Sequence, residues 1–168
     1  MKLVILLVIL FVATGCQRGK IPDGGDAALD TPSAPPPKDD PRTACPPNTE
    51  MQGGPDEFQE WCQKSDGTLQ GRHTIWHKNS YKAAEGDYVQ NLKRGKWSYW
   101  HPNGQKASEG SYQLGKRQGA WSFWHENGQV AESGSYQDGL EDGQWTSYDE
   151  NGEKTSETEF NKGMQLRR

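Results

Sequence analysis

Polar and apolar residues are arranged differently in three successive parts of the chain. Leu3–Ala13 is a continuous apolar run. Residues 17–44 contain no aromatic residue and are rich in Pro, Gly, Asp and Ser. From Gly71 onward, short ring-bearing runs alternate with polar turns, as in the stretch GKWSYWHPNGQ that begins at Gly95. Alternation with a period of two, interrupted by Asn-Gly, indicates strands joined by hairpin turns.

The ring-bearing pattern recurs every 24 residues, in four units that begin at Gly71, Gly95, Gly119 and Gly143. The recurring positions are a first ring at Trp97, Trp121 and Trp145; a second ring at Trp76, Trp100, Trp124 and Tyr148; turn glycines at Gly104, Gly128 and Gly152; and a closing ring at Tyr88, Tyr112, Tyr136 and Phe160. The first unit departs from the pattern, with His73 in place of the first Trp and Asn79-Ser80 in place of Asn-Gly. A fixed period with this many matches is typical of repeat architectures.

Each unit is predicted to be one β-hairpin. Asn-Gly between two ring-rich runs predicts a type I′ turn, because both residues tolerate positive φ. A single hairpin is marginal in water, so the units are expected to pair edge to edge. The expected fold over residues 71–168 is all-β: an elongated antiparallel meander of about four hairpin repeats, or about eight strands.

The N-terminus predicts export and lipid attachment. Residues 1–15 combine Lys2, an apolar run too short to span a bilayer and small residues before Cys16. The ending ATGC resembles the bacterial lipobox, which implies cleavage before Cys16 and lipidation of that residue; an ordinary secretory signal cut elsewhere is the alternative. By resemblance to Gram-negative lipoproteins, Gln17 implies an outer-membrane location in the cell envelope. Residues 16–44 are then the lipidated N-terminus and a disordered tether.

Two cysteines remain once Cys16 is lipidated, Cys45 and Cys62. An even pair in an exported chain predicts one disulfide, with two reduced thiols as the alternative. Residues 45–70 are therefore expected to form a small Cys-bounded leader segment before the repeats.

Composition and charge narrow the classes of function. Hydrophobic residues make up 31% of the chain and mean hydropathy is -1.04, yet it holds seven Trp and six Tyr, so a thin fold that buries rings is expected. Residues 71–118 carry nine basic and three acidic residues (net +6), whereas residues 119–168 carry four and ten (net -6). A nucleic-acid binder would normally be basic throughout. The polarity suits self-association through opposite halves or contact of the basic half with anionic headgroups, although chance drift on solvated turns explains it too.

Two recurring positions of the repeat carry residue types that are common in metal or catalytic sites, but their arrangement does not support such a site. His77, His101 and His125 share one position, yet such positions lie two strands apart, about 9.5 Å, which is too far for ligands of one metal ion. Glu85, Glu109 and Glu157 share another position, which a solvated face flanked by Lys explains as well as acid–base catalysis does. We therefore expect no enzyme, metal or cofactor.

The pattern Gly-x-Trp-x-x-(Tyr/Trp)-x-x-Asn-Gly, followed by Glu-Gly-x-Tyr and a second turn Gly, resembles the MORN repeat variant family over residues 71–166. The resemblance implies a β-sheet repeat scaffold that contacts proteins or membrane surfaces, and some members are labelled as antitoxin components. It brings no catalytic residues. The segment from Cys45 to Gly71 is similar to a Cys-bounded leader that precedes such arrays in bacterial lipoproteins.

Rings are expected on both faces of the sheet, because Trp97 and Tyr99 alternate with Trp100 along one strand. The candidate binding face is the one that carries Trp76, Trp100, Trp124 and Tyr148. The function expected is a lipid-anchored scaffold that binds a protein partner, in an antitoxin-like or envelope-assembly role. The alternative is a module that binds cell-wall or surface glycans between rings of adjacent hairpins.

Overall fold

The computed structural model describes residues 44–54 and 57–166. The predicted signal peptide, Cys16 and all but the last residue of the predicted tether lie outside the described residues. Within those ranges, no helix has the length and apolar character needed to cross a membrane.

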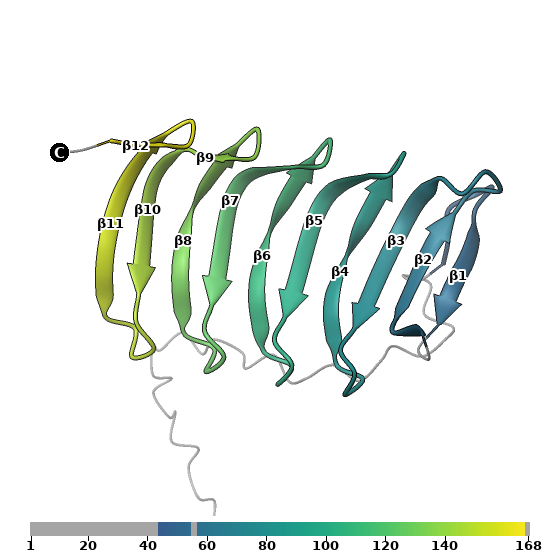
Figure 1. Ribbon diagram of the computed structural model, residues 1–168, viewed down its shortest axis with the longest axis horizontal. Helices are drawn as coiled ribbons and strands as arrows, with labels where there is room; N and C mark the ends of the chain where they lie inside the picture. The colour runs from purple at the N-terminus through teal and green to yellow at the C-terminus, as the bar shows by residue number, and fades with distance from the viewer. Residues whose placement is uncertain (1–43, 55–56, 167–168) are drawn as a thin grey trace, which may run out of the picture.

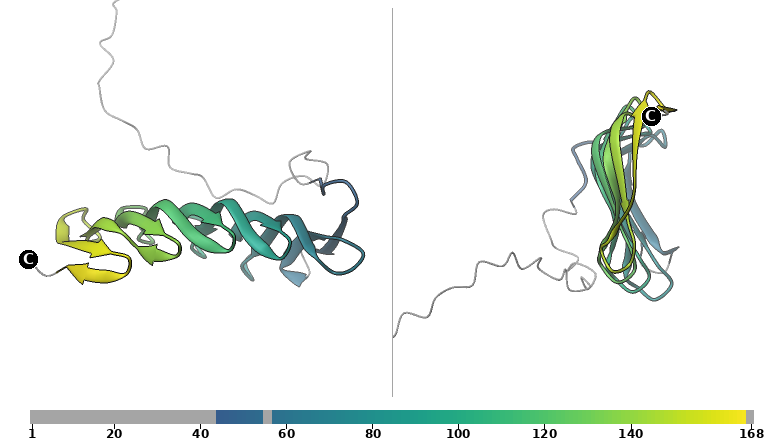
Figure 2. Two further views of the ribbon diagram at one scale, coloured as in Figure 1. Left: turned by 90° about the horizontal axis from the view of Figure 1, so that it is seen from above. Right: turned by 90° about the vertical axis from the view of Figure 1, so that its left-hand side faces the viewer.

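The described elements form one antiparallel sheet in which neighbours in sequence are neighbours in space (Figure 1). The strands are β1 (Glu50–Gly54), β2 (Gln59–Gln63), β3 (Leu69–Trp76), β4 (Lys82–Val89), β5 (Leu92–Trp100), β6 (Lys106–Gln113), β7 (Lys116–Trp124), β8 (Val130–Gln137), β9 (Leu140–Glu141), β10 (Gly143–Tyr148), β11 (Lys154–Asn161) and β12 (Met164–Leu166). Both β9 and β10 pair with β8, so together they take the place of one longer strand. The predicted all-β meander is confirmed. The hairpins follow one another along a single axis as a thin, elongated array (Figure 2).

The Cys-bounded segment is part of this sheet. β1 pairs with β2 and β2 pairs with β3, so the meander begins before Gly71. The predicted disulfide between Cys45 and Cys62 is confirmed, with an S–S distance of 2.13 Å. Cys62 lies in β2 and is 1% exposed, so the bridge ties the start of the described chain to the sheet.

The pairing within each unit follows the repeat. The closing ring of a unit lies directly across from the unit's first Gly, as in the pairs Tyr112 with Gly95, Tyr136 with Gly119 and Phe160 with Gly143. The same pairing joins Tyr88 to Gly71 in the first unit, despite its divergent sequence. Each 24-residue unit is therefore one hairpin in one register.

The turn type predicted at Asn-Gly is wrong. Among the described turn residues 101–105, Gly104 alone has a positive φ (85°), and its N–H donates to the His101 carbonyl. A type I′ turn needs positive φ at both central residues, whereas this geometry fits a type I turn followed by a left-handed residue. Type I′ geometry occurs at the opposite edge, where Leu114 (49°) and Gly115 (78°) both have positive φ in the two-residue loop between β6 and β7.

Side chains of the Asn-Gly turns join each unit to the next. His101 Nε2 lies 2.8 Å from the Trp124 carbonyl oxygen, so this nitrogen donates the hydrogen bond. Asn103 Nδ2 donates to the Glu126 carbonyl, 2.7 Å away. The equivalent bonds recur from His77 and Asn79 and from His125 and Asn127. The histidine column thus has a structural role, and in the described part of the chain no three His, Cys, Asp or Glu residues are grouped as a metal site would require.

Candidate functional site

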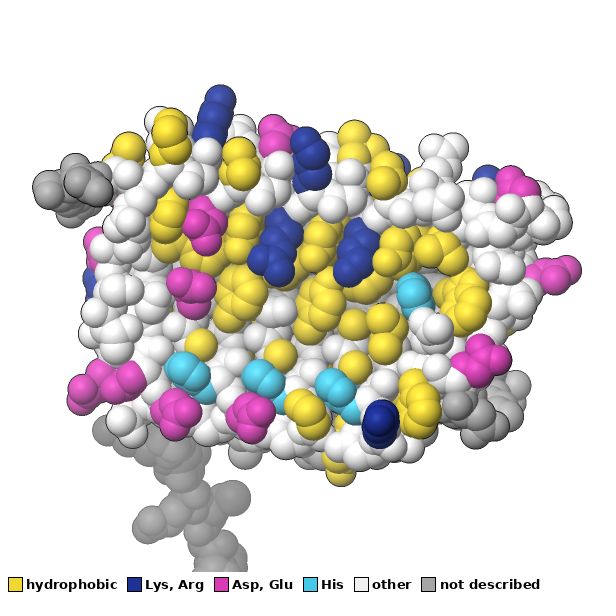
Figure 3. All heavy atoms as spheres, in the orientation of Figure 1, with side chains coloured by type: hydrophobic (Ala, Val, Ile, Leu, Met, Phe, Trp, Pro, Cys, Tyr) yellow, Lys and Arg dark blue, Asp and Glu magenta, His cyan; other side chains and the backbone are white. Residues whose placement is uncertain are grey.

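One face of the sheet carries a continuous row of aromatic side chains, which we call the ring face: Tyr88, Trp97, Tyr99, Tyr112, Trp121, Phe123, Tyr136 and Trp145. Centroids of successive rings along Tyr88–Trp97–Tyr112–Trp121–Tyr136–Trp145 are 4.9 to 6.1 Å apart. Most contacts along this row are edge-to-face, a favourable arrangement of ring quadrupoles. Figure 3 shows hydrophobic side chains gathered in a band along the array, with basic side chains among them.

The tryptophans of the ring face are the most deeply buried large side chains of the described residues, although the sheet has a single layer. Trp97 and Trp121 are each 1% exposed, and Trp145 is 2% exposed. Each indole lies flat on a glycine of the preceding strand, so closely that a methyl group at Gly110 would lie 2.2 Å from Trp121. The Trp121 N–H donates to the Ser111 carbonyl at 3.2 Å, and the other two tryptophans make the equivalent bond. The Trp–Gly pair therefore replaces a second layer.

His73 stands at the position of the first Trp and lies beside a ring of the preceding strand. Its cross-strand partner is Trp61 in β2, and the two ring centroids are 6.0 Å apart. His73 continues the row to Tyr88, with centroids 5.4 Å apart. Burial, with a smaller effect of Lys93, lowers the pKa of His73 and so favours its neutral form.

Two basic side chains lie over the ring face. Lys93 Nζ is 4.0 Å from the Trp97 ring centroid and donates to the Tyr99 hydroxyl at 2.8 Å. The Arg117 guanidinium is 4.5 Å from the Trp121 centroid and donates to the Tyr136 hydroxyl at 2.8 Å. Both side chains are half-buried, and burial lowers the pKa of Lys93. Their apolar stems cover the tryptophans from solvent, a common use of long basic side chains.

Exposed aliphatic side chains follow the edge of the sheet that carries the type I′ turns. We call Leu92, Leu114, Leu140 and Met164 the turn edge. Leu114 is 69% exposed and Met164 is 68% exposed. Neighbouring units meet here, since a methyl group on Gly115 would lie 3.3 Å from Leu92 and one on Gly163 would lie 3.4 Å from Leu140. The turn edge therefore presents apolar groups to solvent along the array.

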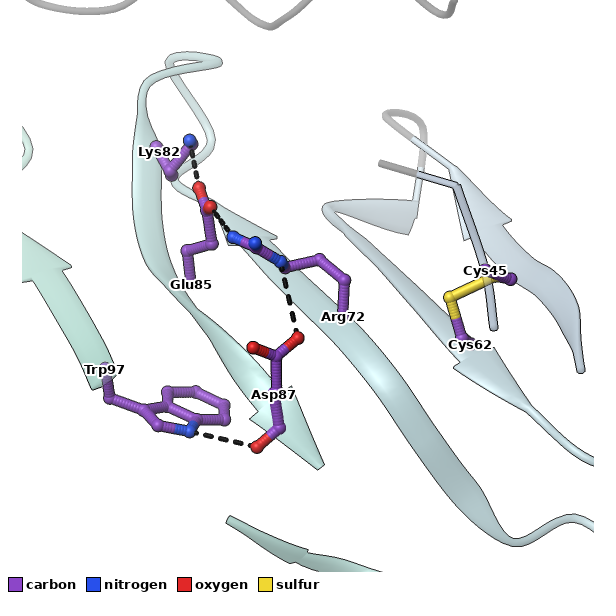
Figure 4. Close-up of polar contacts among 7 residues, drawn as sticks. All are labelled: Cys45, Cys62, Arg72, Lys82, Glu85, Asp87 and Trp97. Carbon is purple, nitrogen blue, oxygen red and sulfur yellow. Dashed lines mark hydrogen bonds and ion pairs between the residues drawn. A yellow bond between two sulfur atoms is a disulfide. The ribbon is translucent and has the colours of Figure 1, made fainter. Parts of the chain in front are cut away.

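The face of the sheet opposite the ring face, which we call the paired face, carries ion pairs. Glu109 accepts from Lys96 (2.8 Å), Lys106 (2.9 Å) and the Ser98 hydroxyl (2.9 Å). In the first unit Glu85 is paired with both Arg72 and Lys82, and Arg72 also lies 3.5 Å from Asp87 (Figure 4). Lys154 and Glu157 form the equivalent pair in the fourth unit. The glutamate column is thus held in ion pairs.

Glu109 makes a testable contribution to acid stability. Burial acts to raise the pKa of Glu109, but hydrogen bonds from Lys96, Lys106 and Ser98 outweigh it and lower the pKa from 4.5 to about 2. A carboxylate with a lowered folded-state pKa stabilises the fold above its unfolded pKa, and this is lost as pH falls through the folded value. After allowance for solvent screening, Glu109→Gln is expected to cost about 1 kcal/mol at neutral pH and nothing near pH 2. Denaturation midpoints from neutral pH to pH 2 test this, and a constant difference would contradict it.

The third unit lacks the ion pair. Val130 and Ser133 stand at the positions of Lys106 and Glu109, so both charges are absent together. A hollow of about 360 Å³ lies at this place, lined by Ser122, Gln129, Val130, Ser133, Tyr148 and Gly152. At the third unit the paired face therefore has an uncharged opening, with hydroxyl, amide and ring groups around it.

The rings expected to bind a partner lie mostly under other side chains. Trp76 is 8% exposed and belongs to the core. Trp100 lines the paired face beside Lys82, whose Nζ is 5.3 Å from its ring centroid. Trp124 is covered in the same way by Lys106 at 5.7 Å, and Tyr148 lines the uncharged hollow.

Sequence reasoning missed the basic pair on the ring face and the exposed Leu114. A column-by-column comparison of the repeat contains both signals. Positions 69, 93, 117 and 141 read Leu, Lys, Arg and Glu, and positions 90, 114, 138 and 162 read Gln, Leu, Asp and Lys. A repeat position whose residue type differs between units does not serve one structural role in all of them, so its residues are candidates for function.

Comparison with protein families identifies the repeats. Residues 93–114, 117–138 and 141–162 match the model described as MORN repeat variant. These ranges fall on the hairpins β5–β6, β7–β8 and β9–β11, so the resemblance expected from sequence is confirmed there. No match to the curated proteins was found.

A solved structure that matches part of this chain is a chain of the Glycosylation Associate Protein (Gap123) complex from Streptococcus agalactiae. It is 14% identical, the match covers 61% of this chain, and the TM-score is 0.37. The matched region spans 19% of that chain, about a fifth of its length, and this likeness has no bearing on function.

Proposed function

Because residues 93–162 make this chain a MORN-type repeat protein, we propose that it is a non-enzymatic scaffold that binds a protein partner through its ring face and turn edge. The observation that carries the proposal is Leu114. This residue has a φ of 49°, a region that costs an L-residue about 1–2 kcal/mol and that Gly or Asn adopts readily. It is also 69% exposed, so packing within the array does not offset that cost. The same turn position has a positive φ in the other units too (Gln90, 52°; Asp138, 54°; Lys162, 48°), so the exposed apolar side chain is what distinguishes Leu114.

The surroundings of Leu114 support the same proposal. The other units have polar residues at this position: Gln90, Asp138 and Lys162. Gly115, the next residue of the same turn, lies beside Leu92, so a second exposed apolar side chain is close to this turn. Large exposed apolar patches on soluble domains often mark sites of protein contact.

The proposed scaffold is anchored to the cell envelope by lipid on Cys16, at the outer membrane if the source is Gram-negative. The sequence of residues 1–16 supports this, together with the disulfide between Cys45 and Cys62, which suits an oxidising compartment. No cofactor and no nucleic acid take part. An antitoxin-like or envelope-assembly role is the wider proposal that follows from the family.

Leu114→Asn separates binding from folding. Asn tolerates the left-handed region, so the variant is expected to be more stable by about 1 kcal/mol, and to capture less partner because the exposed apolar group is lost. Thermal unfolding measures the first effect. Chemical crosslinking in cells followed by affinity isolation and mass spectrometry measures the second.

Asp138→Asn is the matched control, since it makes the same residue at the same turn position one unit away. It is expected to leave the set of crosslinked proteins unchanged. If Leu114→Asn captures the same proteins at the same yield as the wild type, the turn edge is not the contact surface.

A second candidate function, glycan binding, is favoured by the uncharged hollow of the third unit. Ser122, Ser133 and Gln129 offer hydrogen-bonding groups beside the Tyr148 ring, the kind of mixed lining that small neutral ligands use. Recovery of cell-wall or surface glycan, with no enriched protein, would favour this function over the protein scaffold.

A further inference from the structure

Lys93 and Arg117 differ from the basic residues of the paired face. Arg72, Lys82, Lys96, Lys106 and Lys154 all pair with carboxylates. In residues 44–54 and 57–166, neither Lys93 nor Arg117 has such a partner, and both contact rings and phenol hydroxyls. The sheet thus neutralises the positive charge on one face and leaves it open on the other.

The surroundings of the two cations make an unpaired charge costly. Both side chains are half-buried, which removes part of their hydration. Ring contacts offset some of this cost, by about 0.5–2 kcal/mol for each cation. A half-buried cation gains more from a carboxylate than a fully exposed one does, because solvent screens the pair less. Lys93 and Arg117 are therefore positioned to gain from an anionic ligand.

Polar groups of the ring face extend the two charges into a row. The Tyr99 and Tyr112 hydroxyls are 3.1 Å apart, and Lys93 donates to the first of them. The Tyr136 hydroxyl accepts from Arg117. These hydroxyls and cations come from strands β5 to β8 in the middle of the array, over the tryptophan row. A chain that crosses the strands here would meet rings, hydroxyls and positive charges in turn.

The distance between Lys93 and Arg117 indicates how far apart the negative charges of a ligand should lie. Lys93 and Arg117 occupy the same position of successive units, two strands or about 9.5 Å apart. A peptide in the extended polyproline II conformation has three residues per turn and advances about 3.1 Å per residue, so carboxylates three residues apart lie on one side of it, about 9.3 Å from each other, and match this distance. The next residues of the column are Leu69 and Glu141, which end the positive stretch on either side.

We propose that the ring face binds an extended acidic segment of the partner protein, with two carboxylates three residues apart placed on Lys93 and Arg117. This inference rests on the proposed protein-binding function and adds the chemistry of the partner. A lipid surface fits less well, because recognition of anionic lipids typically uses clusters of four to eight basic residues. Glu141 would also repel a longer anionic ligand.

The test measures binding of a labelled Gly/Ser peptide that carries Glu at every third position, by fluorescence anisotropy with the full chain in detergent. The paired probe has Gln in place of each Glu. In Lys93→Met/Arg117→Met, the apolar stems still cover Trp97 and Trp121 while both charges are lost. We expect this variant to bind the Glu peptide about tenfold more weakly or worse. Lys93→Arg, which keeps the charge, is expected to bind it nearly as well as the wild type.

The matched control is Lys96→Met/Lys154→Met, which removes two charges from the paired face and is expected to change the affinity by less than about twofold. The inference is overturned if the wild type does not bind the Glu peptide, if it binds the Gln peptide equally well, or if the Lys93/Arg117 variant matches the control. Binding to phosphatidylglycerol vesicles in place of the peptide would also overturn it. If the Glu peptide does not bind but partner capture in cells still depends on Leu114, only this inference fails. If partner capture does not depend on Leu114, the proposed contact surface is wrong.

Discussion

Gly110→Ala is expected to destabilise the protein by about 3 kcal/mol or more. The added methyl group would lie 2.2 Å from two atoms of the Trp121 indole, inside the distance at which real side chains pack. Trp121 cannot move away easily, because it is 1% exposed and its N–H is held by the Ser111 carbonyl. Chemical denaturation followed by tryptophan fluorescence measures the change.

Gly54→Ala is the matched control for this substitution. Gly54 also lies in a strand, but a methyl group there would meet nothing within 4 Å. Its effect is expected to stay within about 0.5 kcal/mol. Gly86→Ala and Gly134→Ala should repeat the large loss, since they face Trp97 and Trp145 at 2.3 and 2.2 Å. If Gly110→Ala unfolds at the same denaturant concentration as Gly54→Ala, the indole does not pack on the backbone as described.

Trp121→Ala is expected to cost about 3–5 kcal/mol, as does loss of a large aromatic side chain from a well-packed core. Four rings lie within ring-contact distance of Trp121, so its removal interrupts the row: Tyr99, Tyr112, Phe123 and Tyr136. The described residues form one thin sheet, with no second layer among them to close the gap. Equilibrium denaturation of the purified chain measures this loss.

Trp124→Ala supplies the comparison from the same strand. Trp124 is half-buried on the other side of the sheet, with Lys106 over its ring. Its loss is expected to cost about 1–2 kcal/mol, because less area is buried there. Equal losses at Trp121 and Trp124 would show that both faces are packed alike, and would contradict the distinction between core and paired face.

The repeat itself was predictable because its signals are local. A first Trp, an Asn-Gly turn and a closing ring at a fixed interval define a hairpin, and the pairing of Tyr112 with Gly95 follows from that interval. The turn type was not predictable in this way. Residue preference favours Asn-Gly for a type I′ turn, but the strand register leaves more than two residues between Trp100 and Lys106 and only two between Gln113 and Lys116. Leu114 therefore adopts a conformation that its residue type disfavours.

Burial in a single-layer sheet was harder to predict. Alternation along β5 places Trp97 and Trp100 on opposite faces, but it does not show which ring is covered better. Two contacts between strands decide this: the glycine beneath each first Trp, and the basic stem above it, as with Gly86 and Lys93 around Trp97. Both partners are distant in sequence from the ring. The prediction that Trp100 and Trp124 form the binding face stays a prediction, and their coverage by Lys82 and Lys106 favours the ring face instead.

The most direct test of the scaffold proposal compares two neighbouring residues of β7 that point to opposite sides. A photoreactive benzoylphenylalanine replaces Phe123 on the ring face in one variant, and Ser122 on the paired face in the other. After irradiation of living cells, we expect protein crosslinks from position 123 and few or none from position 122. Crosslinks from position 122 alone, or from neither position, would contradict a protein partner on the ring face.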